Sequence, residues 1–167
     1  MNPQNEMYYV PEEVIAGDLR VGGILNQLTE KEKKYATFLH LSAFSLFPVL
    51  ANSVSKESLS IHEFLSAYLL SVKPSDAHLA INNPTEDNRI FRQLINYAAV
   101  FYLCSSNYYG FGDTKFIPRL KKEELHDFIS KTSSTILPLL DACIDDMFSL
   151  DPISVRSLGF PPHGVRS

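Results

Sequence analysis

The sequence predicts a mostly α-helical protein of about six helices, with an extended N-terminal arm and an irregular C-terminal tail. Apolar residues recur at helical spacing over six segments, and several segments begin with residues typical of helix N-termini. The chain has 167 residues, 45% of them hydrophobic and 20% charged, which is enough for one domain with its own core. No sheet larger than a short hairpin is expected.

The arm covers residues 1–27, which show no strong hydrophobic period. Residues 8–10 favour a short extended piece that Pro11 ends, and three glycines interrupt the rest of the arm: Gly17, Gly22 and Gly23. We expect the arm to pack on the rest of the molecule.

The first clear helix is expected to begin after Thr29, because Thr29 and Glu32 have the spacing of a capping box. Its apolar positions are expected to face inward: Tyr35, Phe38, Leu39, and Leu41 or Ser42. Pro48 removes an N–H donor and clashes with the turn before it, which predicts a kink or a break at that point.

The next two helices have the clearest patterns. Ser60 and Glu63 suggest a second capping box, followed by one apolar stripe: Ile61, Phe64, Leu65, Tyr68, Leu69 and Val72. Another helix is expected after Thr85, a residue type that caps helices, with acids in its first turn. Residues 97–104 of that helix are apolar nearly all round, which predicts burial on most sides.

Two further helices are expected over 121–131 and 134–150, and Pro138 is tolerated only in the first turn of the second. Three acids crowd that last helix: Asp141, Asp145 and Asp146. Paired carboxylates can perform acid–base chemistry, but a solvated helix face is the favoured interpretation.

Composition also bears on partners and compartment. The net charge of −4 gives no basic surface that would attract nucleic acid or acidic lipid. The N-terminus does not have the pattern of a secretory signal, and no apolar run is expected to be long enough to cross a bilayer. We therefore expect a cytoplasmic protein without nucleic-acid or membrane partners.

No catalytic or metal-ligating set is predicted from the residues. His62 and Glu63 begin HEFLS, whereas a zinc helix of the HExxH type needs a second His where Ser66 stands. The other histidines lie in separate segments without ligand spacing, and no Ser–His–Asp or Cys–His set is evident.

The stretch NYYGFGDTKFIP, residues 107–118, is the remaining candidate. Gly110 and Gly112 supply backbone angles that other residues avoid, and Lys115 could pair with Asp113 or with another segment. The glycine spacing does not match a phosphate-binding loop. Taken by its residues alone, the stretch favours a structural turn over a binding loop.

The same stretch resembles the NYKSFGDTKFIP segment of the dipeptidyl peptidase III family, with FGDTKF identical over six consecutive positions. Members of that family are cytosolic zinc exopeptidases that release dipeptides from the N-termini of short peptides. Weaker similarity lies, in order, in LTEKEKKYATFLHLSAF (28–44), YAAVFYLCSSN (97–107) and LGFPPHG (158–164). Tyr109 and Gly110 depart from the family pattern, which has Lys and Ser.

The resemblance implies a role for the loop. In the family, the Phe of FGDTKF lies on a peptide-binding cleft between two lobes, which makes Phe111 the expected substrate contact. Gly110, Gly112 and Asp113 are expected to shape the loop. Residues 1–167 then resemble one helical segment of the lobe that does not bear zinc.

The resemblance also implies what this chain does not supply. The family's HExxGH zinc helix and its further Glu ligand are not in the sequence, so the zinc-bearing lobe is absent. The full enzyme would use zinc to activate water, with a Glu as general base. The chain is therefore expected to hold no cofactor and to be inactive by itself. Its expected partners are the missing C-terminal part of the enzyme and short peptides.

An alternative function comes from another class. The chain could be a stand-alone helical domain that binds peptides or proteins without catalysis. An exposed apolar patch would suit either function, because the missing lobe or a partner must cover it.

Overall fold

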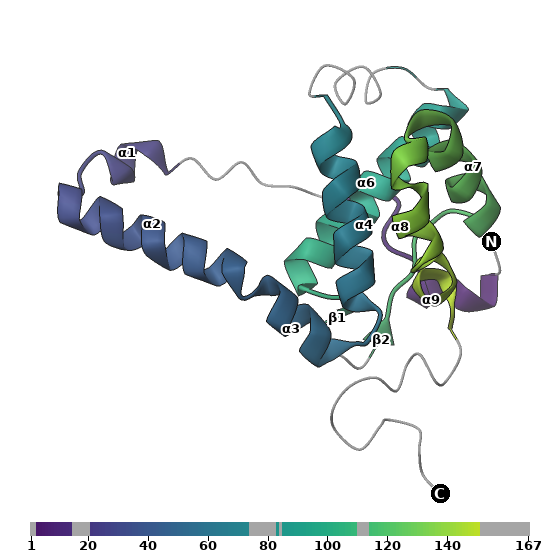
Figure 1. Ribbon diagram of the computed structural model, residues 1–167, viewed down its shortest axis with the longest axis horizontal. Helices are drawn as coiled ribbons and strands as arrows, with labels where there is room; N and C mark the ends of the chain where they lie inside the picture. Colours follow the sequence, from purple (N-terminus) through teal and green to yellow (C-terminus); the bar gives the residue numbers. More distant parts are fainter. Residues whose placement is uncertain (1–2, 15–20, 74–82, 84, 110–113, 151–167) are drawn as a thin grey trace, which may run out of the picture.

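The computed structural model describes residues 3–14, 21–73, 83, 85–109 and 114–150, and this part of the chain is predominantly helical (Figure 1). Most of the helices form a body, and α2 with α3 projects from it, with α1 beside the far end of α2; from here on "the arm" means α2 and α3. The body contains α4 (Ser58–Ser71), α6 (Glu86–Cys104), α7 (Lys122–Thr132), α8 (Leu137–Asp141) and α9 (Ile144–Phe148), and the arm is α2 (Glu30–Ser45) with α3 (Phe47–Val54). The described residues form one sheet, a two-stranded hairpin. The mostly helical prediction is confirmed.

Residues 3–14 of the N-terminal segment pack on the body, as predicted, whereas residues 21–27 do not, since Gly22–Leu25 has no buried residue. Tyr9 forms a parallel bridge with Ile117, whose N–H donates to the Tyr8 carbonyl oxygen at 2.7 Å. Val10 is fully buried. Two short helices form where none was predicted: the 3₁₀ helix η1 (Pro3–Tyr8) and α1 (Gly22–Leu25).

The start of α2 confirms the first capping box. Thr29 is the extended N-cap residue, and its Oγ1 accepts a bond from the Glu32 N–H at 3.4 Å. The Glu32 carboxylate in turn accepts from the Thr29 N–H at 2.8 Å. Two backbone donors at the helix N-terminus thus find partners within the same turn.

The predicted inward face of α2 is wrong. No residue of α2 is buried, and Tyr35 and Phe38 are 71% and 66% exposed. The remaining predicted core positions of this helix are also exposed: Leu39, Leu41 and Ser42. Periodicity shows that a helix has an apolar face, but burial needs a second surface, and the described residues do not provide one.

The predicted break at Pro48 is confirmed. Pro48 stands in the first turn of α3, where its missing N–H costs no helical bond. The interruption is slight, because the Leu50 N–H still donates to the Leu46 carbonyl oxygen at 3.0 Å.

The expectation that no apolar run could cross a bilayer is wrong by length and composition. Residues Glu30–Val54 form a 25-residue helical run that is long enough and apolar enough to cross a membrane. Only 6% of its most apolar window is buried. One such run is weak evidence for a membrane span, because helices of soluble proteins meet the same criteria.

The start of α4 corrects a second prediction. The helix begins at Ser58 rather than after Ser60, and Glu57 at its N-cap makes no side-chain cap bond. The predicted apolar stripe is confirmed, with four members buried and two partly buried: Ile61, Phe64, Leu65, Tyr68, and then Leu69 and Val72. The Ser60–Glu63 spacing was therefore misleading, because Ser55, Glu57 and Ser58 are buried just before it.

The helix α6 begins at the predicted cap, where Thr85 Oγ1 accepts from the Asn88 N–H at 3.2 Å. Tyr97 and Phe101 are fully buried, but Leu103 is 83% exposed. The predicted burial of the last turns on most sides is therefore only partly correct. Ser105 ends the helix with a φ of 58°, the left-handed conformation common after a helix.

The predicted helix over 134–150 is divided in the structure. The 3₁₀ helix η2 (Ser134–Ile136) leads into α8, and Ala142 and Cys143 separate α8 from α9. Pro138 lies in the first turn of α8, as required. Leu140 of α8 and Met147 of α9 are both fully buried in the core.

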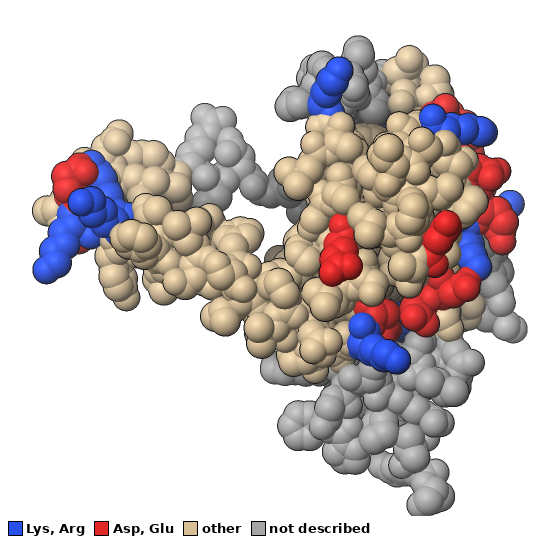
Figure 2. Space-filling view, in the orientation of Figure 1, with Lys and Arg blue, Asp and Glu red and all other residues tan. Residues whose placement is uncertain are grey.

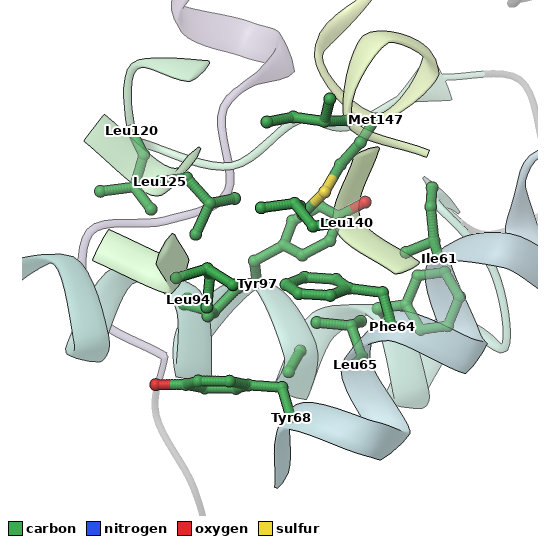
Figure 3. Packing of buried hydrophobic residues seen from close by; sticks show 14 of the residues in the cluster. Ile61, Phe64, Leu65, Tyr68, Leu94, Tyr97, Leu120, Leu125, Leu140 and Met147 are labelled. Atoms are coloured by element: carbon green, nitrogen blue, oxygen red, sulfur yellow. The ribbon is translucent and has the colours of Figure 1, made fainter. Parts of the chain in front are cut away.

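The core forms where the body helices meet (Figure 3). Side chains from five helices and the chain before α7 interdigitate there: Ile61, Phe64, Leu65, Tyr68, Leu94, Tyr97, Leu120, Leu125, Leu140 and Met147. The packing fixes the start of α4 against the end of α6, and these two helix ends hold the hairpin.

Candidate functional site

The candidate site is the hairpin that carries residues 110–113. Strands β1 (Tyr108–Tyr109) and β2 (Thr114–Lys115) are antiparallel, with Tyr108 opposite Lys115 and Tyr109 opposite Thr114. The four residues singled out by the sequence lie outside the described residues, so their roles stay predictions: Gly110, Phe111, Gly112 and Asp113. The structure describes the base from which this loop extends.

Lys115 anchors the second strand of this base. Its Nζ lies 3.0 Å from Glu57 Oε1, and the two side chains are 0% and 5% exposed. The same Nζ donates to the Asp146 carbonyl oxygen at 2.7 Å. Of the two partners left open for Lys115, the structure thus provides one in another segment, at the start of α4.

Asn107 extends this ion pair into a buried polar network. Its Nδ2 donates to Glu57 Oε1 at 3.1 Å, so that one carboxylate oxygen accepts from both Asn107 and Lys115. Its Oδ1 accepts from Ser55 Oγ at 2.8 Å and from Ser58 Oγ at 2.9 Å. A satisfied network of this kind favours one arrangement of the segments it joins, because each lost bond would leave a buried polar group without a partner.

The rest of the hairpin base is apolar. The ring of Tyr109 packs on that of Phe116 at 4.6 Å, and the Phe116 N–H donates to the Asn107 carbonyl oxygen at 3.0 Å. The chain then pairs with the N-terminal segment, where Arg119 Nε donates to the Val10 carbonyl oxygen at 2.9 Å. Both ends of the 110–113 loop therefore leave from well-packed positions.

Sequence reasoning missed most of this network. It considered Lys115 but gave no role to the other members of the network. These lie about fifty residues apart, with Ser55, Glu57 and Ser58 in one segment and Asn107 in the other. One usable signal was the position of Lys115 next to the apolar Phe116 and Ile117, where a charged side chain needs a buried partner.

His62 lies in a small aromatic cluster rather than in a metal site. Its ring packs on Phe47 at 4.4 Å, and its Nδ1 is 3.2 Å from Ser66 Oγ, which also contacts the Tyr102 hydroxyl at 2.9 Å. Burial lowers the pKa of His62 below its ordinary value, and nearby Glu63 opposes this effect. Ser66 thus has a hydrogen-bonding role at the position where a zinc helix would have its second His.

The acidic residues near the C-terminus form a solvated face, as favoured. Asp141, Asp145 and Asp146 are exposed, Asp145 pairs with Lys122, and an Asp141 oxygen lies 3.2 Å from His126 Nε2. Within the described part of the chain, no group of three or more His, Cys, Asp or Glu residues could hold a metal ion.

A pocket of about 270 Å³ lies near the other end of α4. Tyr68, Phe91 and Phe128 form its apolar part, and Asp87 is the carboxylate among its lining residues. Ser58 and Ser71 mark the two ends of α4, about 20 Å apart at the usual helical rise. The pocket is therefore separate from the hairpin and does not bring a catalytic set together.

Comparison with known proteins identifies what the chain is similar to. No protein-family model matches it. It is 33% identical to dipeptidyl peptidase 3 of Dictyostelium discoideum over 161 residues, which are 96% of this chain and 23% of that protein. Identity is 30% with dipeptidyl peptidase 3 of Nematostella vectensis, over 95% of this chain and 23% of that protein. Identity with the human dipeptidyl peptidase 3 is 28%, over 95% of this chain and 22% of that protein.

The chain therefore spans less than a quarter of the length of these relatives. Each match runs through nearly all of this chain, well beyond the FGDTKF stretch. The resemblance to the dipeptidyl peptidase III family is thereby confirmed, with a coverage consistent with an N-terminal portion of such a protein.

Proposed function

We propose that the chain is the N-terminal part of a dipeptidyl peptidase III-like zinc exopeptidase, and that it contributes to the cleft that binds the peptide. The observation that carries this proposal is the match to proteins named dipeptidyl peptidase 3 over about 95% of the chain. The complete enzyme would remove dipeptides from peptide N-termini in the cytoplasm. The chain by itself would be inactive.

Zinc, which the family implies, does not fit the described residues of this chain, because no suitable group of ligands is found among them. The one HExx sequence has Ser66 where a second His is needed, and Ser66 is bonded to His62 and Tyr102. In this proposal the remaining part of the enzyme holds the metal ion and performs the chemistry.

This chain's own contribution would be Phe111. The flanking strands support that role, because Asn107 and Lys115 anchor the hairpin through buried bonds. A loop held at both ends can present a ring in a defined position. An apolar ring suits peptide side chains of varied kind, and glycines at 110 and 112 leave it uncovered by neighbouring side chains.

A chimera tests the proposal. Residues 1–167 would replace the matched segment of the Dictyostelium dipeptidyl peptidase 3, and release of dipeptides from a chromogenic arylamide would be measured. We expect the chimera to be active, and Phe111→Ala to raise KM about tenfold or more while zinc content stays the same. The matched control is Leu70→Ala, since Leu70 is 87% exposed on α4 and away from the hairpin.

Two results would overturn the proposal. One is a folded, zinc-loaded chimera without dipeptidyl-peptidase activity. The other is an active chimera in which Phe111→Ala and Leu70→Ala leave KM equally unchanged. Zinc content and circular dichroism separate these outcomes from a failure to fold.

The alternative of a stand-alone interaction domain is favoured by one observation, the exposed apolar arm. Five large apolar residues of α2 are between 53% and 71% exposed. If the isolated chain binds a short peptide or a partner protein as tightly as the chimera does, this alternative replaces the enzyme fragment.

A further inference from the structure

Part of the exposed apolar surface of the arm forms one continuous stripe, and Leu41 and Phe44, also exposed, lie outside it. At about 100° per residue, six large side chains fall within a third of the helix circumference, counted through α2 and α3. They are 49% to 71% exposed: Tyr35, Phe38, Leu39, Leu46, Val49 and Leu50. Figure 2 shows charge at the far tip of the arm and an uncharged surface along its length.

The stripe has the spacing of a helix-packing seam. Positions 35, 39, 42, 46 and 49 are alternately four and three residues apart, the repeat by which one helix packs along another. Ser42 lies within the stripe, and its hydroxyl donates to the Phe38 carbonyl oxygen at 2.8 Å. The hydroxyls of Thr37 and Ser45 likewise donate to backbone carbonyl oxygens of the helix. A partner surface could therefore cover the arm without leaving these hydroxyl donors without an acceptor.

The stripe is larger than a single folded chain normally leaves open. With about 150–250 Å² for a whole aromatic side chain, the exposed parts of the six residues sum to roughly 700 Å². The largest apolar patch on a typical monomer is about 300–600 Å², and each partner in a standard interface contributes about 800 Å². The area therefore matches one side of a stable interface.

A bilayer is a poor occupant of this surface. The first turn of α2 is charged, and Ala51 is buried on the body at the other end. Residues 35–50 remain, and they span about 24 Å, less than the roughly 30 Å of a bilayer core. The uncharged and exposed part of the 25-residue run is therefore shorter than a bilayer core.

We propose that the stripe is the surface on which the rest of a dipeptidyl peptidase 3-type protein packs. This inference rests on the proposed function. The matched segment is 22% to 23% of each relative, so more than three quarters of such a protein lies beyond the match and is available to cover the arm. The complementary surface is an apolar groove.

Two aromatic residues of α2 provide a matched pair of variants. Phe38 and Phe44 are 66% and 65% exposed, and Phe38 lies in the stripe while Phe44 lies on the opposite side of the helix. Phe38→Asp and Phe44→Asp make the same chemical change in the same helix. A difference between them therefore reports the surface and not helix stability.

The first experiment co-expresses the tagged chain with the Dictyostelium dipeptidyl peptidase 3 from which the matched segment has been removed. We expect a one-to-one complex by light scattering, weakened tenfold or more by Phe38→Asp and less than twofold by Phe44→Asp. Equal effects of the two variants would overturn the assignment of the stripe. The assignment would also be overturned if no one-to-one complex formed and the tagged chain instead formed a dimer or bound to phosphatidylcholine vesicles.

The second experiment uses the chimera and does not depend on assembly from two pieces. Amide hydrogen exchange over residues 35–50 should slow at least tenfold in the chimera relative to the isolated chain, and Phe38→Asp should reverse this. Equal exchange in the isolated chain and in a folded chimera would overturn the proposal. Protection of the arm without any effect of Phe111→Ala on KM would reject only the proposed cleft.

Discussion

The Nζ of Lys115 lies 3.0 Å from Oε1 of Glu57, and almost no surface of either side chain reaches solvent. The two residues are far apart in sequence, one on β2 and the other at the N-cap of α4. Asn107 Nδ2 donates to the same carboxylate oxygen at 3.1 Å. The position of the hairpin on the body therefore depends on a buried pair in which each charge needs the other.

Lys115→Met should destabilise the chain by about 3–5 kcal/mol, because it leaves the Glu57 carboxylate buried without its cation. The double variant Lys115→Met/Glu57→Leu should recover part of the loss, since it removes both charges. Urea unfolding followed by circular dichroism measures the free energies of unfolding of the unmodified chain, the single variant and the double variant.

Lys122→Met is the control for the ion pair, because Lys122 and Asp145 are 44% and 82% exposed. Exposed pairs contribute little in water, so the urea midpoint should hardly change. A loss for Lys115→Met no larger than that for Lys122→Met would show that the buried pair does not hold the hairpin.

Phe111→Ala should cost about 1 kcal/mol or less in the isolated chain, as expected for an exposed loop residue. Phe101→Ala is the comparison, because Phe101 is fully buried and its truncation should cost about 3–5 kcal/mol. If the two variants lose similar stability, Phe111 belongs to the core and the loop is only a turn.

His62 should make the chain less stable in mild acid. Burial lowers its pKa below the ordinary 6.5, so the unfolded chain binds more protons at this imidazole than the folded protein does. The stabilisation is complete above that ordinary value and is lost as the pH falls through it toward the lower folded pKa. The urea midpoint should therefore fall between about pH 7 and pH 5.

His62→Gln should flatten this dependence, whereas His40→Gln, at an exposed position on the arm, should leave it unchanged. The measurement is a set of urea titrations over that interval for the three proteins. An equally steep fall in the absence of His62 would assign the acid sensitivity to other groups.

The isolated chain should neither retain zinc through dialysis nor release dipeptides from a chromogenic arylamide. The reason is the absence of an HExxH or HExxGH motif from the sequence, with Ser66 at the decisive position. Metal analysis and the arylamide assay measure both properties. Stoichiometric zinc together with dipeptide release would show that this chain holds a complete catalytic site.

Local sequence determined where α2 and α6 begin. Thr29 and Thr85 cap α2 and α6 as predicted, and the stripe from Ile61 to Tyr68 is buried as its spacing indicates. Capping and periodicity involve residues three or four positions apart, so the sequence contains the needed information. The wrong start of α4 has the opposite cause, since Ser58 bonds Asn107, about fifty residues away in the sequence.

Tertiary structure decided what these helices and the hairpin touch. The pattern that buries Phe64 in α4 leaves Phe38 of α2 mostly exposed, because burial depends on whether another surface packs on the face. The partner of Lys115 was likewise open until the fold brought α4 beside the hairpin. Sequence alone therefore determined the mostly helical fold class, the starts of α2 and α6 and the family resemblance, whereas only long-range packing decided which faces and charges are covered.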